Sequence, residues 1–320
     1  MHTARFGKTG MEITPIGFGA WAIGGGGWAA AWGPQDDDEA VGAIRRAVEL
    51  GVNWVDTAAV YGLGHSEELV ARALKGVPEA DRPFVFTKCS LVWDEEGNIS
   101  NVLDKDSVKR ECEESLGRLQ TDVIDLYQIH WPRPEEDIEV GWEALEQLRD
   151  EGKVRHIGVS NFDVPQMERI GRIAPVETLQ PPYSMLNRGV EEEILPYCEE
   201  HDIGVIVYSP MRSGLLTGKM TPQRVANLPS DDWRRNAEDF QEPRLSRNLR
   251  LVELLEEIGR NHSRPPAEVA IAWTLRHPAV TAAIVGGRRP DQVDGIIGAA
   301  DFRLSEEELE RIESFLRENP

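Results

Sequence analysis

Four ionisable side chains of different chemistry lie at, or just after, the ends of short apolar runs. Asp56, Lys88 and His130 each close such a run, and Tyr61 follows Asp56 by a few residues. An ammonium group that a carboxylate holds beside a phenol stabilises the phenolate and lowers the tyrosine pKa from its usual value of about 10. We therefore predict that Tyr61 donates or accepts a proton, while His130 orients the oxygen that shares it.

A carbonyl oxygen that becomes an alcohol is the natural partner of such a phenol. No protein side chain supplies the hydride for that reduction, so the four residues imply a redox cofactor. Metal-assisted chemistry has little support, because none of the seven histidines forms a His-x-His or His-Glu-x-x-His pattern.

Short apolar runs alternate with longer segments of helical period along the chain. We predict strands over 16–19, 53–56, 84–88, 123–130, 156–160, 177–180, 204–208 and 282–285. We predict helices over 36–50, 66–74, 104–119, 135–151, 163–173, 191–201, 248–261 and 291–300. Eight strands, each followed by a helix and with no linker between them, indicate an α/β fold: a single (β/α)8 TIM barrel domain over residues 1–320.

Some segments stand outside this alternation. Residues 1–15 predict an N-terminal β-hairpin with its turn at 8–10, and additional C-terminal helices are predicted over 266–276 and from Ser305 to Leu316. Residues 210–247 are polar and rich in proline. Because the segment is too long for a plain connection, we predict that it is a functional loop. In a barrel of this kind the active site lies at the carboxyl ends of the strands, where Asp56, Lys88 and His130 stand.

The charge of the chain restricts its partners. Its 320 residues include 35 Lys and Arg against 56 Asp and Glu, a net charge of −21, which disfavours nucleic acid and anionic membranes as partners. No apolar run has a membrane-spanning length, and the N-terminus lacks the apolar core of a signal peptide, so we expect a cytoplasmic protein. Three widely spaced cysteines indicate neither a disulfide framework nor a zinc site.

Motifs spread from Phe6 to Ala300 resemble the aldo-keto reductase superfamily. They include Asp56-Thr57-Ala58, Tyr61-Gly62, Thr87-Lys88, Gln128-Ile129-His130-Trp131-Pro132, Gly158-Val159-Ser160-Asn161-Phe162 and Tyr208-Ser209-Pro210. The segments 21–24, 32–33 and 214–219 are similar to a prokaryotic branch that includes general stress reductases and inositol-operon reductases. The resemblance implies that Tyr61 is the general acid or base, that Asp56 and Lys88 tune it, and that His130 orients the carbonyl group.

The resemblance also implies NADPH or NADP+ as the cofactor. The nicotinamide positions fall on Gly19, Ala20, Trp21, Asp56, Ser160, Asn161, Gln180 and Tyr208. The pyrophosphate positions fall on Ser209, Pro210, Met211, Gly214, Leu215 and, more weakly, Lys219, and the adenosine 2′-phosphate positions on Gly286, Gly287, Arg288 and Gln292, next to Arg289. One departure concerns the adenine: many members carry an acidic residue followed by Asn where this chain has Gly295 and Ile296.

Aromatic side chains on the rim predict the wall of a substrate cleft, with contacts from Trp21, Tyr61, Trp93, His130 and Trp131. The leading hypothesis is an NADPH-dependent reductase of a small aldehyde or ketone, such as a sugar or aromatic carbonyl, or a dehydrogenase that runs in reverse. A cofactor-sensing regulatory or interaction protein on the same fold is the alternative. A metal-dependent hydrolase or aldolase is a third, disfavoured by the absent ligand spacing and by the Lys88–Asp56 pairing.

Overall fold

Eight parallel strands close into a barrel in the computed structural model, which describes residues 1–229 and 232–319. Around the barrel the strands follow the order β10 (Thr178–Gln180), β11 (Gly204–Val207), β12 (Val280–Gly286), β3 (Ile16–Gly19), β4 (Trp54–Asp56), β5 (Phe84–Cys89), β8 (Ile124–Ile129) and β9 (Val154–Ser160). These are the eight predicted strands, and their ends differ by two residues at most. The predicted TIM barrel is confirmed.

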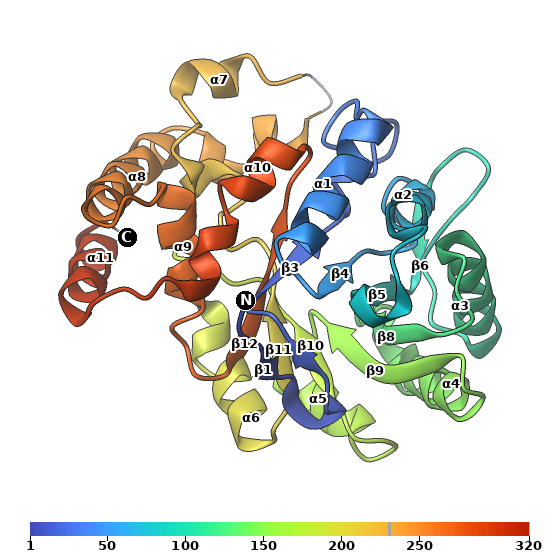
Figure 1. Ribbon diagram of the computed structural model, residues 1–320. Helices are drawn as coiled ribbons and strands as arrows, with labels where there is room; N and C mark the ends of the chain where they lie inside the picture. The colour runs from blue at the N-terminus through green and yellow to red at the C-terminus, as the bar shows by residue number, and fades with distance from the viewer. Residues whose placement is uncertain (230–231, 320) are drawn as a thin grey trace.

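Helices surround the strands on the outside (Figure 1). They are α1 (Asp37–Glu49), α2 (His65–Leu74), α3 (Lys105–Leu119), α4 (Ile138–Asp150), α5 (Val164–Ile170), α6 (Ile194–Glu200), α8 (Arg244–Asn261), α9 (Pro266–Thr274), α10 (Pro290–Asp294) and α11 (Glu306–Glu318). The helix predicted over 291–300 is two pieces, because α10 stops at Gly295 and a 3-10 turn follows over Ile297–Asp301. Glycine is a poor residue for a helix interior.

Side-chain caps define where several helices begin. The carboxylates of Asp36 and Asp104 accept the backbone N–H three residues later, at the starts of α1 and α3. Asp163 and Ser305 form capping boxes at α5 and α11, the second as predicted. Such caps satisfy backbone donors that have no partner within the helix.

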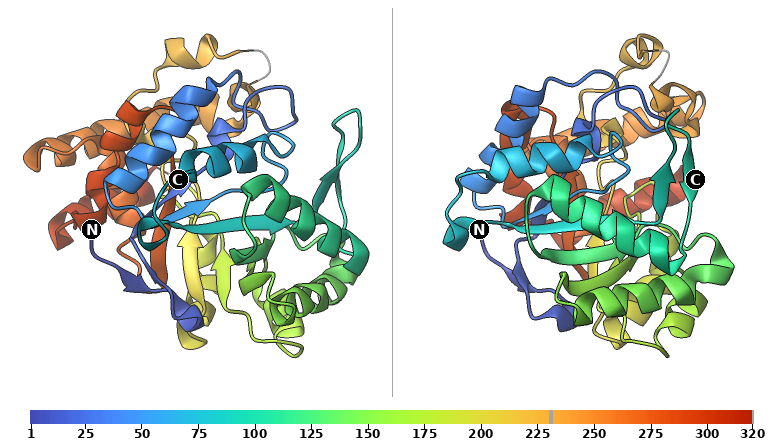
Figure 2. Two further views of the ribbon diagram at one scale, coloured as in Figure 1. Left: turned by 45° about the vertical axis from the view of Figure 1, so that its right-hand side comes forward. Right: turned by 90° about the vertical axis from the view of Figure 1, so that its right-hand side faces the viewer.

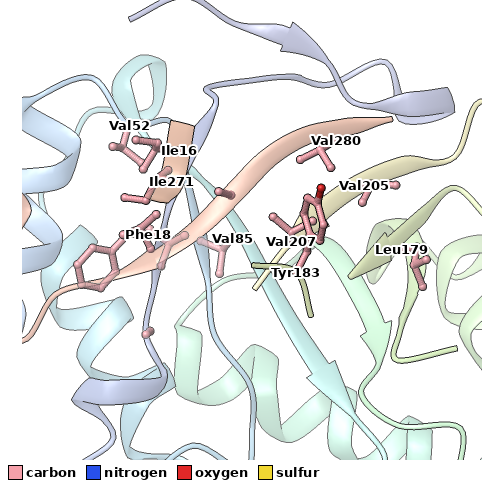
Figure 3. Close-up of a cluster of buried hydrophobic side chains, with 14 of the residues drawn as sticks. Ile16, Phe18, Val52, Val85, Leu179, Tyr183, Val205, Val207, Ile271 and Val280 are labelled. Atoms are coloured by element: carbon pink, nitrogen blue, oxygen red, sulfur yellow. The ribbon is translucent and has the colours of Figure 1, made fainter. Parts of the chain in front are cut away.

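Two apolar layers hold the barrel. The outer layer lies between the strands and the surrounding helices, and Figure 3 shows Ile16, Phe18 and Val85 among its buried members. The inner layer fills the barrel with large side chains such as Trp54 and Phe86. The N-terminal hairpin, β1 (Ala4–Arg5) with β2 (Glu12–Ile13), adds Phe6 and Ile13 to this inner layer, as a packed barrel requires.

The loops at the carboxyl ends of the strands carry elements that the sequence did not predict. After β5 the chain forms a hairpin of β6 (Leu91–Trp93) and β7 (Ile99–Asn101), which projects from the barrel in Figure 2. The predicted loop over 210–247 contains the short helix α7 (Pro222–Ala226) and several 3-10 turns, and its residues 230–231 lie outside the described part. No helix in 1–229 or 232–319 is long and apolar enough to cross a membrane.

Candidate active site

A cavity of about 820 Å³ opens at the carboxyl ends of the strands. Its floor is made by strand-end residues, and its walls come mainly from residues in 21–39, 209–224 and 286–296, together with Arg234 and with Leu91 and Ile99 of the β6–β7 hairpin. Gly19 and Gly286 stand opposite each other on the paired strands β3 and β12, and both line the cavity. Because neither has a side chain, this part of the floor leaves room for a flat group.

Asp56 is the centre of a buried polar cluster at the end of β4. Its Oδ1 accepts a hydrogen bond from Lys88 Nζ over 2.6 Å, and its Oδ2 accepts one from Gln180 Nε2 over 2.8 Å. Lys88 also donates to the carbonyl oxygen of Thr57 over 2.8 Å. The carboxylate and the ammonium are therefore paired and held in place, as the buried position of both charges requires.

Tyr61 and His130 lie above this cluster, with part of each side chain open to the cavity. Lys88 Nζ is 5.3 Å from the centre of the Tyr61 ring. The rings of Tyr61 and His130 meet edge to face, with centroids 5.7 Å apart. The structure thus brings together the four residues that the sequence singled out.

The protonation equilibria correct one expectation. Burial, followed by the negative charge of Asp56, raises the pKa of Tyr61 well above its usual value, whereas we expected Lys88 to lower it. Burial also lowers the pKa of Lys88 and, with the nearby Lys88 charge, that of His130. At neutral pH Tyr61 is therefore a protonated phenol and His130 a neutral imidazole, so both have a proton to donate.

A chain of hydrogen bonds links the predicted nicotinamide residues. The Tyr208 hydroxyl donates to Asn161 Oδ1 over 2.8 Å, and Asn161 Nδ2 donates to the carbonyl oxygen of His130 over 3.0 Å. The Ser160 hydroxyl donates to the carbonyl oxygen of Gln180 over 2.9 Å. These residues lie at, or directly after, the ends of β8, β9, β10 and β11, and all of them line the cavity.

Most of the predicted pyrophosphate and adenosine residues also line the cavity. The residues that line it are Ser209, Pro210, Met211, Gly214, Lys219, Gly286, Arg288 and Gln292. Three predicted cofactor residues do not line it. Ala20 is buried, with its N–H donated to the carbonyl oxygen of Asp56. Leu215 is also buried, and its N–H donates to the carbonyl oxygen of Arg212. Gly287 packs against α10.

Arg288 is anchored to the loop between β3 and α1. Its Nε donates to Gln35 Oε1 over 2.6 Å, and its Nη atoms donate to the carbonyl oxygens of Trp32 and Pro34. Arg289 instead pairs with Asp291 at the surface. Both arginines line the cavity, but only Arg288 is bonded to the loop between β3 and α1 in the described structure.

Tryptophans wall the end of the cavity that holds Tyr61 and His130. Trp21, Trp28 and Trp131 line it, and the indole N–H groups of Trp21 and Trp28 are donated to the loop carbonyl oxygens of Ala30 and Gly25. These two rings therefore present apolar faces to the cavity. Trp93 was predicted to contact substrate, but it is not among the lining residues, and its ring lies against the Arg118 guanidinium.

Sequence reasoning missed the contact between two rim loops. Trp233 of the long loop stacks on Trp21 with ring centroids 6.0 Å apart, and Arg234 lies 4.5 Å over the ring of Trp32. The Asp232 carboxylate forms an ion pair with the Arg234 guanidinium over 2.6 Å. The adjacent Trp and Arg in a polar loop were the available signal, but nothing in the sequence specified their partners.

Close backbone packing places the loop that carries Trp28 against Tyr61. A Cβ atom on Gly62 would lie 2.0 Å from the carbonyl oxygen of Gly24, and Gly62 has a φ of +63°. Any other residue here would adopt an unfavourable positive φ and would push the Gly24 backbone away, so the position requires glycine. The glycine-rich segment 24–27 therefore packs against the backbone next to the phenol, and it leads to Trp28, whose ring lies 6.2 Å from that of Tyr61.

The family model of the aldo/keto reductase family matches residues 15–317. The chain belongs to this family. Aldo-keto reductase YhdN of Bacillus subtilis (strain 168) is 37% identical over 317 residues, 99% of this chain and 94% of that protein. The NADH-specific methylglyoxal reductase of Escherichia coli (strain K12) is 32% identical over 319 residues, 96% of this chain and 95% of that protein. This aldo/keto reductase is accordingly an oxidoreductase.

Solved structures of other members of the family share the architecture. The glycerol dehydrogenase AKR11B4 from Gluconobacter oxydans superposes with a TM-score of 0.88 at 37% identity, over 97% of this chain and 93% of that one. An aldo/keto reductase from Klebsiella pneumoniae, in complex with NADP and acetate, has a TM-score of 0.73 at 29% identity, over 98% and 95%. The predicted family resemblance is confirmed.

Proposed function

We propose that this aldo/keto reductase reduces a small uncharged aldehyde or ketone to the alcohol with NADPH. The observation that carries the proposal is the buried cluster of Asp56, Lys88 and Gln180 directly beneath Tyr61 and His130. It places a charge-balanced support under a phenol and an imidazole that share one cavity with the predicted nicotinamide residues.

NADPH, when bound, supplies the hydride. The phenol of Tyr61 donates its proton to the carbonyl oxygen, and its high pKa keeps that proton available at neutral pH. Lys88, held by Asp56, provides the positive charge that offsets the phenolate left behind. Neutral His130 donates a second hydrogen bond to the same oxygen and so favours the developing negative charge.

The residues of the cavity suit a dinucleotide. Ser160, Asn161 and Gln180 offer amide and hydroxyl groups for a carboxamide, above the flat floor of Gly19 and Gly286. The guanidinium of Arg288 at the far end suits a 2′-phosphate, because guanidinium groups bind phosphate through paired, charge-assisted hydrogen bonds. The NADP bound by the Klebsiella relative supports this choice, and the NADH-specific Escherichia coli relative makes it a point to be measured.

The carbonyl end of the cavity favours uncharged substrates. Its lining residues beside Tyr61 and His130 are aromatic or aliphatic: Trp21, Ala22, Trp28, Val60, Leu91, Ile99 and Trp131. A carboxylate or phosphate on the substrate would lose its water there without gaining a cationic partner, which costs free energy. The names of the relatives, a methylglyoxal reductase and a glycerol dehydrogenase, also refer to small uncharged compounds.

Oxidation of NADPH and of NADH by the purified protein tests the proposal. Benzaldehyde and 4-carboxybenzaldehyde form a pair that differs by one carboxylate group on the ring. We expect turnover with NADPH and a kcat/KM for benzaldehyde at least tenfold above that for the carboxylated analogue. Binding of nucleotide without turnover of any aldehyde, ketone, polyol or sugar would favour the cofactor-sensing alternative instead. Equal kcat/KM values for the pair would overturn the substrate class.

A further inference from the structure

A buried carboxyl group of α3 lies behind the carbonyl end of the cavity. Glu111 is 4% exposed, and its Oε2 accepts a hydrogen bond from the backbone N–H of Ser90 over 2.9 Å. Its Oε1 accepts one from the Ser107 hydroxyl over 3.2 Å. Neither the proton transfer nor the cofactor site uses this group. Because burial of a carboxyl group costs free energy, its position points to a task at Ser90.

Ser90 directly follows β5 and turns the chain sharply. Its φ of +83° lies in the left-handed region, which residues with a side chain seldom adopt unless their surroundings hold them there. Three contacts hold it: the N–H is bound by Glu111, the carbonyl oxygen accepts the N–H of Val102 over 3.1 Å, and the hydroxyl accepts the N–H of Trp131 over 3.3 Å.

This turn joins the end of β5 to the end of β8. The backbone N–H of His130 donates to the carbonyl oxygen of Cys89 over 3.1 Å, and that of Trp131 donates to the Ser90 hydroxyl. His130 and Trp131 both line the cavity. Two successive residues of the carbonyl site are therefore bound to two successive residues of a turn that Glu111 holds.

We propose that Glu111 is a positioning residue of the carbonyl site, which acts through Ser90 on the placement of Trp131 and His130. The inference rests on the proposed carbonyl reduction. Glu111 does not line the cavity, so its effect on substrate passes through the Ser90 turn. Trp131 is the residue most directly linked to that turn, and KM for the carbonyl substrate is the parameter most affected.

Titration of Glu111 makes this link measurable as a pH dependence of KM. Burial raises the pKa of Glu111 to about 7, so both of its forms are populated near neutral pH. The ionised form makes a charge-assisted bond to the Ser90 N–H, which is stronger than the bond from a neutral carboxyl group. We therefore expect the turn to be held more firmly above pH 7 than below it.

Other ionisable groups surround Glu111. They are Arg110, Cys112 and Glu114 of α3, Cys89 of β5, Tyr127 of β8 and Glu67 of α2. Burial raises the pKa of Cys89, Cys112 and Tyr127, which stay neutral at pH 6–8. Arg110 is bound to the Ser107 hydroxyl, and Glu67 is paired with Arg118.

The test measures kcat and KM for benzaldehyde from pH 5.5 to 8.5 at saturating NADPH, in the wild type, Glu111→Gln, Ser90→Ala and the Glu111→Gln/Ser90→Ala double variant. Glu268→Gln is the control. Glu268 is another buried acidic residue that accepts a backbone N–H, from Gly298 over 3.1 Å, but it lies in α9 and also pairs with Arg264. We expect the wild-type KM to rise about threefold as the pH falls through 7, with kcat little changed. Glu111→Gln should have a raised KM without this transition, and the double variant should be no worse than the poorer single variant.

Several results would overturn the inference while the proposed function stands. One is a Glu111→Gln variant whose KM equals that of the wild type and keeps the pH transition. Another is a double variant in which the effects of the two substitutions on KM are additive. Equal loss of kcat, aldehyde KM and NADPH KM would indicate general loosening rather than positioning. If Glu111→Gln fails to fold, Ser90→Ala carries the test alone, and an unchanged KM there also refutes the link. A wild-type protein that reduces no carbonyl compound refutes the proposed function instead.

Discussion

The side-chain amide of Gln180 donates to the carboxylate of Asp56 over 2.8 Å, and this bond joins β10 to β4 across the mouth of the barrel. It connects a predicted nicotinamide residue with the carboxylate that holds Lys88. In the proposed function, a change at Gln180 therefore affects both cofactor binding and the support of the phenol.

Replacement of Gln180 by Leu is expected to weaken NADPH binding about tenfold and to lower kcat, because it removes the amide and leaves Asp56 Oδ2 with one donor fewer. Tryptophan fluorescence titration and steady-state kinetics measure the two effects. Gln128→Leu is the control, since Gln128 is also buried in the barrel but has no polar side-chain partner in the described structure. An unchanged nucleotide affinity in Gln180→Leu would exclude Gln180 from the cofactor site.

The kcat for carbonyl reduction is expected to stay flat between pH 7 and 9. The raised pKa of Tyr61 keeps its proton in place over this range, and the lowered pKa of His130 keeps the imidazole neutral. Oxidation of the alcohol should instead accelerate as the pH rises, because Tyr61 must first lose its proton. In Lys88→Met that rise should move to higher pH, because the charge that favours the phenolate is gone. A kcat for reduction that falls with rising pH, with an apparent pKa near 8, would contradict this account.

Cofactor preference is expected to depend on Arg288. Arg288→Ala should weaken NADPH binding about ten- to a hundredfold and leave NADH binding nearly unchanged, because a charge-assisted bond contributes about 1.5–3 kcal/mol. Gln35→Ala is the control: it removes a loop contact of Arg288 but keeps the guanidinium, so it should not discriminate between the nucleotides. Parallel losses for NADPH and NADH in Arg288→Ala would mean that Arg288 acts only by anchoring the loop.

Glu111 should also make stability depend on pH. Because its pKa rises from 4.5 to about 7 in the folded protein, the folded chain binds more protons than the unfolded chain between these values. The Glu111 contribution to the free energy of unfolding therefore falls as the pH rises from 4.5 to 7. Glu111→Gln has no carboxyl group to titrate. Its free energy of unfolding should therefore exceed that of the wild type by up to about 3 kcal/mol at pH 8 and by little at pH 4.5. Urea unfolding at the two pH values checks this, and an equal difference at both would contradict it.

The strands and most helices were predictable because their apolar patterns and caps are local. Asp56, Lys88 and His130 could be grouped because barrel strands end on one rim. The β6–β7 hairpin was missed because its strands are half-buried or exposed and pair with each other outside the barrel, so they lack the buried apolar run that marks the barrel strands. The stacking of Trp233 on Trp21 was missed because it joins residues far apart in the sequence.

Electrostatic surroundings were the least predictable part of the site. The sequence places Lys88 near Tyr61 but does not give the degree of burial, and burial decides the direction of the Tyr61 pKa. In the same way, Trp93 lies on the predicted rim, but packing against Arg118 decides where its ring lies. Such properties depend on the assembled structure rather than on local pattern.

Tyr61→Phe tests the central claim most directly, because it keeps the ring and removes only the proton donor. Single-turnover reduction of benzaldehyde with NADPH should slow by about 10²- to 10⁴-fold, while NADPH affinity stays within a fewfold of the wild type. Tyr127→Phe is the matched control, since the buried Tyr127 hydroxyl lies outside the cavity and has no partner in the described structure. Its rate should equal that of the wild type. A wild-type rate in Tyr61→Phe would show that another group supplies the proton and would contradict the account.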